Sequence, residues 1–143
     1  MMKTSARNQF DGTVRAIRSG AVNDEIELDI AGGLHIAATI TRESSVELGL
    51  MVGTPATALV KASSVLLATD TTGTRFSARN QLIGTIAQVT PGAVNTEVAV
   101  AVSGGNTVVA IVTNESAQAL GLAAGAEVLA MFKVSSVILA VQA

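Results

Sequence analysis

The chain has 143 residues, of which 49% are hydrophobic and only 14% are charged, and its formal net charge is −2. It has no Trp, Tyr or Cys. It therefore lacks the basic surface and stacking side chains of nucleic-acid-binding proteins, and disulfides, zinc ribbons and cysteine nucleophiles are excluded. Polar residues interrupt every apolar run before the roughly 18 residues that a membrane span needs, and the first residues lack the apolar segment of a secretory signal. We expect a globular cytoplasmic protein without a nucleic-acid or membrane partner.

Three strands are predicted in the first part of the chain. Residues 9–18 are rich in β-branched residues and precede a Ser-Gly turn signal, and residues 25–30 alternate acidic and apolar side chains. Gly32 and Gly33 can adopt the positive φ of a tight hairpin, after which residues 34–41 return as a third strand. The side chains that this alternation turns toward a core are Ile26, Leu28 and Ile30.

A short helix is predicted next, because the apolar spacing changes from two to four residues over 42–50. Ser44 or Ser45 is the expected N-cap, and Gly49 or Gly53 is the expected end. The helix therefore separates the first three strands from those that follow.

Two further strands are predicted at 56–61 and 64–68. Three antiparallel strands, a short helix and two more strands form the order of an OB-like five-stranded barrel, so the predicted fold class is mainly all-β. In the second half, residues 98–102 and 108–112 lack a polar face. They are predicted to be strands buried on both sides, in contact with another module or chain.

The sequence is an internal duplication with an offset of 72 residues, which carries Ser5 onto Ser77 without a gap. We therefore predict two tandem domains, 4–71 and 76–143, each an OB-like five-stranded barrel with one short helix. The polar stretch 69–75 is expected to connect them. Modules this short, without disulfides or zinc, bury little apolar surface alone, so we expect the domains to pair and the chain to oligomerise.

Two duplicated motifs offer hydrogen-bond donors. Ser-Ala-Arg-Asn, at 5–8 and 77–80, supplies hydroxyl, guanidinium, amide and backbone N–H groups and contains no carboxylate, which suits a tetrahedral dianion that only accepts hydrogen bonds. A solvated strand start is the alternative. The Lys-x-Ser motif of Lys61 and Lys133 repeats the combination of cation and hydroxyl, unless it is only a turn with a surface lysine. The candidate residues are Ser5, Ala6, Arg7, Asn8, Lys61 and Ser63, with Ser77, Ala78, Arg79, Asn80, Lys133 and Ser135 in the second repeat.

A third duplicated motif is Gly-Ala-Val-Asn. Glycine lets a backbone approach an anion or a neighbouring chain closely, but a plain turn explains the motif equally well. On a symmetry axis, one set of donors per subunit would converge on a single ion. The motif comprises Gly20, Ala21, Val22 and Asn23 in the first repeat and Gly92, Ala93, Val94 and Asn95 in the second.

The remaining polar residues give no sign of catalysis. His35 aligns with Thr107, so a mechanism common to both repeats cannot need it. Glu25 and Glu97 are predicted on an exposed strand face, with structural roles. Since the sequence shows no nucleophile–base–acid set, phosphate loop or histidine cluster, we expect neither an enzyme nor direct ligands for a metal cation.

The motifs Ser5–Asn8, Gly20–Asn23 and Lys61–Ser64, with their repeats, resemble those of the molybdate-binding Mop family, the molybdenum-pterin-binding proteins, in its tandem form. The resemblance covers both repeats. It implies a cytoplasmic homotrimer that binds molybdate, with tungstate as a mimic, for molybdenum storage, buffering or homeostasis. It also implies anions at domain interfaces, held by the Ser-Ala-Arg-Asn and Lys-x-Ser residues, and near a threefold axis, held by the Gly-Ala-Val-Asn turns. Pro91 and Asn106 depart from the first repeat and are expected to make the sites unequal.

The alternative function is a structural or partner-recruiting oligomerisation module. Such a module predicts no response to oxyanions and an apolar patch that stays exposed after assembly. A binding protein predicts stabilisation by molybdate, because a ligand of the folded state raises stability by mass action.

Overall fold

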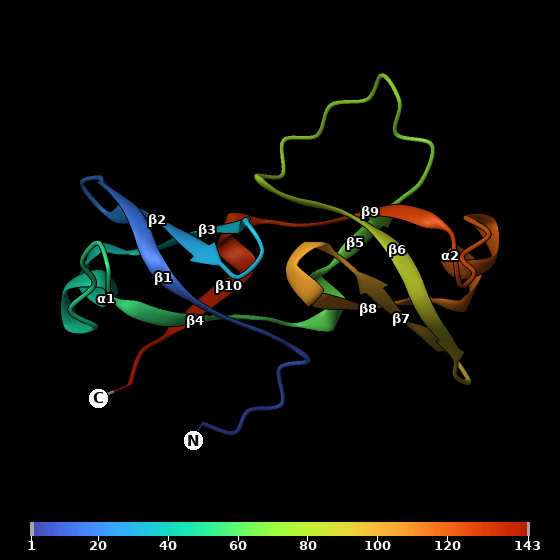
Figure 1. The fold of residues 1–143 in the computed structure, drawn as a ribbon, viewed down its shortest axis with the longest axis horizontal. Coiled ribbons are helices and arrows are strands. Elements are labelled where there is room, and N and C mark those ends of the chain that lie inside the picture. Colours follow the sequence, from blue (N-terminus) through green and yellow to red (C-terminus); the bar gives the residue numbers. More distant parts are fainter. Residues whose placement is uncertain (1, 143) are drawn as a thin grey trace.

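The computed structural model describes residues 2–142, which form two five-stranded antiparallel sheets, each with one six-residue helix (Figure 1). The mainly β fold class is therefore confirmed. The first unit has the strand order β10-β4-β1-β2-β3, and the second has the order β5-β9-β6-β7-β8. The strands of the first unit are β1 (Asn8–Ser19), β2 (Asn23–Ile30), β3 (Leu34–Thr41), β4 (Pro55–Val60) and β10 (Val137–Ala140). Those of the second unit are β5 (Leu66–Ala68), β6 (Asn80–Pro91), β7 (Asn95–Ala101), β8 (Thr107–Thr113) and β9 (Glu127–Phe132).

Short helical elements connect the strands. The two α-helices are α1 (Arg42–Glu47) and α2 (Asn114–Ala119), and they lie at opposite ends of the molecule (Figure 1). The three 3-10 turns are η1 (Ala62–Ser64), η2 (Ser103–Gly105) and η3 (Val134–Ser136).

The last strand of each sequence repeat lies in the sheet of the other repeat. Leu67 of β5 pairs with Ala130 of β9, and Leu139 of β10 pairs with Ala58 of β4. The expectation that a repeat closes its own barrel is therefore wrong for its fifth strand. The two fifth strands have nearly the same apolar sequence, so either fits the edge of either sheet, and the sequence pattern cannot distinguish them. The predicted domain boundaries thus follow the sequence repeat. Each sheet, however, consists of four strands from one repeat and the fifth strand of the other repeat.

The first three strands of each unit follow the predicted alternation. Ile26 and Leu28 are fully buried and Ile30 is nearly so. The β2–β3 hairpin turns at Gly32 and Gly33, whose φ angles of 85° and 81° are the positive values that a tight turn needs. The long strands β1 and β6 each contain a bulge, which bends the strand so that its two halves pair with different neighbours.

The helix N-cap differs from the prediction. Thr41, rather than Ser44 or Ser45, caps α1, and its Oγ1 accepts a hydrogen bond from the Ser44 backbone N–H at 3.1 Å. The second helix is capped in the same way by Thr113. The helix ends before Gly49, as predicted. The N-cap lies one turn earlier than expected because the third strand runs directly into the helix without a loop.

Strands β7 and β8 are buried on one face only, which corrects the prediction of burial on both. The residues on the outer face of β8 are half-buried, and η1 and the start of β1 from the first unit lie against the free edge of this strand. The predicted contact of β8 with another module is therefore present within the chain, at the edge of the strand. The fully buried core residues of these strands are Val98, Val100, Val108 and Ala110, and the half-buried residues between them include Ala99, Val109 and Ile111.

The hairpin tips of the two units touch each other. A Cβ added to Gly32 would lie 2.0 Å from the Cα of Gly104, so the two backbones are in direct contact. Asn106 strengthens this contact, because its Nδ2 donates to the carbonyl oxygens of Ala31 at 2.9 Å and Ser103 at 3.0 Å. The departure of Asn106 from the first repeat thus contributes to the contact between units.

Candidate functional site

The structure brings the two predicted donor motifs of each repeat together at the boundary between the units. Asn8 pairs with Val60 in the β1–β4 ladder, so Arg7 lies beside Lys61 where the ladder ends. In the second unit Asn80 pairs with Phe132, which places the second arginine beside the second lysine in the same way. We call these clusters the first and second donor groups. The first donor group is Ser5–Asn8 with Lys61 and Ser63, and the second is Ser77–Asn80 with Lys133 and Ser135.

The asparagine of each donor group fixes that group to the opposite unit. Asn8 is 1% exposed, and its side-chain amide donates to the Val109 carbonyl at 2.8 Å and accepts from the Val109 N–H at 2.7 Å. Asn80 makes the same two bonds to Ala37, both at 2.8 Å. These side-chain amides are already bonded to backbone groups of the edge strands β8 and β3. Their observed role is to join the units, and their role as anion ligands stays a prediction.

Each duplicated arginine forms an ion pair with a glutamate of the opposite unit. Arg7 pairs with Glu97 on β7, and Arg79 pairs with Glu25 on β2. The predicted absence of carboxylates from the donor groups is therefore wrong. The sequence motif itself contains no acid, but the partner strand, distant in sequence, supplies one. One sequence signal could have suggested this pairing: the two arginines are related by the repeat offset of 72 residues, and the two glutamates are related by the same offset.

The other donors of both groups face solvent. Ser5, Arg7, Lys61 and Ser63 are exposed, whereas Ala6 is partly buried. The second group has the same distribution at the corresponding positions. Each group therefore places two cations and two hydroxyls, all of which can donate hydrogen bonds, on adjacent chain segments.

The Gly-Ala-Val-Asn turns lie away from the donor groups, at opposite ends of the molecule (Figure 1). In the first turn, the Gly20 N–H donates to the Asn23 carbonyl at 2.8 Å, and the Arg42 N–H donates to the Val22 carbonyl at 2.8 Å. The valine side chain is 71% exposed, and Val94 of the second turn is 72% exposed. The turns therefore present an apolar side chain and a backbone loop outward, with the helix start holding each loop in place.

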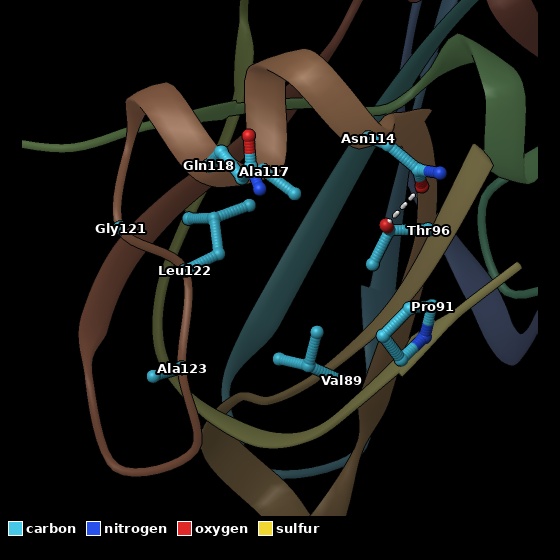
Figure 2. A pocket seen from close by; sticks show the side chains of 9 residues that line it. All are labelled: Val89, Pro91, Thr96, Asn114, Ala117, Gln118, Gly121, Leu122 and Ala123. Atoms are coloured by element: carbon cyan, nitrogen blue, oxygen red, sulfur yellow. Dashed lines mark hydrogen bonds between the residues drawn. The ribbon is translucent and has the colours of Figure 1, made fainter. Parts of the chain in front are cut away.

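The surroundings of the two turns differ between the units. In the second unit, Thr96 donates to the Asn114 Oδ1 at 2.6 Å beside Pro91, at the edge of an open cavity of about 480 Å³ under α2 (Figure 2). The corresponding residues of the first unit are Asp24 and Arg42. The Oδ1 of Asp24 is buried and has no hydrogen-bond partner among residues 2–142. The surroundings of the turns therefore differ at Thr96 and Asn114 as well as at Pro91, a residue that was expected to make the sites unequal.

His35 lies outside both donor groups and both turns. Its Nε2 lies 3.0 Å from Asp29 Oδ1, and Arg15 lies between it and Glu27 on the exposed face of the first unit. Across the described residues, 2–142, no group of three His, Cys, Asp or Glu side chains could hold a metal ion. No helix in the same range is long and apolar enough to cross a membrane.

Relatives of this chain are named for molybdenum. The molybdenum-pterin-binding protein MopA of Rhodobacter capsulatus is 45% identical over 97% of this chain and 52% of its own length. The molybdenum transport protein ModE of Herbaspirillum seropedicae is 45% identical over 99% of this chain and 52% of its own length. The chain thus spans about half the length of these curated relatives.

A solved structure has the same fold over its whole length. It is described as the cytoplasmic molybdate-binding protein ModG with molybdate bound, and it matches with 48% identity and a TM-score of 0.96, covering 99% of this chain and 100% of that chain. The TOBE domain family matches residues 4–67 and 77–139, which are most of both repeats. The chain is therefore a member of the TOBE domain family, with two copies of the domain in tandem.

Proposed function

We propose that this chain binds molybdate at its two donor groups and serves the storage, buffering or homeostasis of molybdenum in the cytoplasm. The observation that carries the proposal is the convergence of an exposed arginine and an exposed lysine in each donor group, at the boundary between units. A neighbour with 48% identity is described as cytoplasmic and as holding molybdate, which supports both the ligand and the location.

The ligand residues of this proposal are those of the donor groups. Cations and hydroxyls donate to the four oxygens, and the small alanine allows the ion to approach the backbone. Tungstate has the same charge and shape, so it is expected to bind as well. The proposed role is binding and release without chemical conversion.

We extend the proposal to a homotrimer in which the Gly-Ala-Val-Asn turns meet at a threefold axis. Large apolar side chains are exposed around the first turn and its helix, as expected for a surface that another copy covers. The most exposed of these are Val22 at 71%, Val46 at 73%, Met51 at 69% and Val52 at 69%. In this arrangement, each turn contributes one set of backbone donors to an ion on the axis.

Thermal unfolding with increasing sodium molybdate tests the proposed ligand. The melting temperature should rise by several degrees once molybdate exceeds its dissociation constant about a hundredfold, because binding to the folded state then contributes about 2.7 kcal/mol. Sodium tungstate should act similarly, and sodium chloride at equal ionic strength is the control. A melting temperature that stays constant up to millimolar molybdate would contradict the proposal and favour a purely structural module.

A further inference from the structure

The two ion pairs between the units involve residues that are duplicated together. Arg7 and Arg79 are related by the repeat offset, and so are their partners Glu97 and Glu25. All four side chains remain partly exposed, the arginines at 50% and 47% and the glutamates at 34% and 27%. The pairs are therefore within reach of a solute ion, which distinguishes them from a sealed structural bridge.

The asparagine contacts position each glutamate next to a donor group. Asn8 is bonded to Val109 of β8, and Val109 lies opposite Ala99 of β7, two residues from Glu97. Both residues of β7 lie on the same face, since strand side chains alternate. The register of β2 and β3 repeats this placement at the second donor group. The carboxylates are thus held beside the guanidiniums by backbone pairing.

Each donor group consequently has two cations, with one carboxylate of the opposite unit beside them. A carboxylate and a tetrahedral oxyanion use the same guanidinium N–H donors, because both are acceptors that suit bidentate bonding. In each pair the carboxylate contacts one terminal guanidinium nitrogen of the arginine. An anion that bonds to this nitrogen must displace the glutamate, and an anion that uses the other guanidinium N–H groups is repelled by the nearby like charge.

We propose that Glu25 and Glu97 are affinity-determining residues, which compete with the bound oxyanion for Arg79 and Arg7. This inference rests on the proposed function of the donor groups. The favourable free energy of anion binding is then reduced by the free energy of the arginine–glutamate interaction that the anion has to replace.

Calorimetric titration with sodium molybdate at fixed ionic strength tests this role. The Glu25→Gln/Glu97→Gln double variant keeps the side-chain shape but removes both charges. Its dissociation constant should be about two- to fivefold lower than that of the unmodified protein, with the same stoichiometry, as expected for loss of a partly exposed ion pair.

Glu27→Gln is the matched control, because Glu27 lies on the same strand and face as Glu25 but pairs with Arg15. Its molybdate affinity should equal that of the unmodified protein. Unchanged or weaker binding by the folded double variant would overturn the inference and assign the ion pairs to stability alone. Equal tightening in the control and in the Glu25→Gln single variant, which removes the same number of charges, would also overturn it, by assigning the effect to net charge.

Thermal unfolding without molybdate checks that the variants are folded, and the two single variants apply the same test to one donor group at a time. Absence of molybdate binding by the unmodified protein would be a failure of the proposed function. The first titration of the series shows this before any variant is compared.

Discussion

The side-chain amides of Asn8 and Asn80 each satisfy both the N–H and the C=O of one residue on an edge strand of the other unit. Replacing Asn8 with Ala leaves both backbone groups of Val109 without these partners. We expect a loss of about 2–4 kcal/mol in the free energy of unfolding, since a buried unpaired group costs about 1–3 kcal/mol. Urea denaturation measures this loss.

The control for this variant is Gln9→Ala. Gln9 is the next residue of the same strand, and its exposed side chain makes one local hydrogen bond to the Ala6 carbonyl at 3.3 Å. Its replacement should change stability by less than about 0.5 kcal/mol. Equal losses in the two variants would contradict the role that we assign to Asn8.

Substitutions at the adjacent residues Gly32 and Gly33 distinguish backbone strain in the hairpin from a steric clash with the other unit. Both have positive φ, but a Cβ on Gly33 meets nothing within 4 Å, whereas one on Gly32 clashes with the backbone of Gly104. Gly33→Ala should cost about 1–2 kcal/mol through backbone strain alone. Gly32→Ala should cost clearly more, because the hairpin tips must also separate. Similar melting temperatures for the two variants would refute the contact between the tips.

The sequence singled out the residues of the donor groups but not their contacts between the units. Arg7, Lys61 and their repeats are candidates because they are identical at the repeat offset, and their role as ligands stays a prediction. The partners Glu97 and Glu25 were placed correctly on a strand face but were assigned only a structural role. A sequence motif contains residues that are neighbours in the chain. These ion pairs join strands of different units, so they can be recognised only from the three-dimensional structure.

At the scale of elements, the exchange of β5 and β10 ties the two units together. Each sheet contains one strand from the other repeat, so cutting the connection between repeats should not separate them. We expect that a protease site inserted between Gly73 and Thr74, in the exposed connection, can be cleaved without changing the elution volume of the native protein. Denaturing electrophoresis should then show two fragments.

Separation of the two fragments under native conditions would contradict the strand exchange. The uncut protein with the same insertion is the control, because it shows whether the inserted residues alone alter the assembly. The expected result depends on edge pairing of β5 with β9 and of β10 with β4.

Strands and the hairpin were predictable because their signals are local. Alternation placed Ile26 and Leu28 in the core, and the glycines marked the hairpin. The N-cap at Thr41 was missed because a strand runs directly into the helix there. The position of the fifth strands was beyond sequence reasoning, because two nearly identical segments compete for two nearly identical edges.

At the scale of the whole molecule, the proposed homotrimer makes a measurable prediction. Light scattering coupled to gel filtration should give three times the mass of one chain. The Val22→Asp/Val94→Asp double variant should give the mass of one chain, because like charges would converge where the turns meet on the axis. A single-chain mass for the unmodified protein would contradict the trimer.

The proposed function depends most on the donor groups as the place where an oxyanion is held. Calorimetric titration of a Lys61→Gln/Lys133→Gln variant tests this directly. Both lysines are exposed, so the variant should unfold at the same temperature as the unmodified protein when molybdate is absent. We predict that its molybdate affinity falls about tenfold or more, since each site loses one charge-assisted hydrogen bond worth about 1.5–3 kcal/mol. Molybdate binding with unchanged affinity and stoichiometry in this variant would contradict the proposed function.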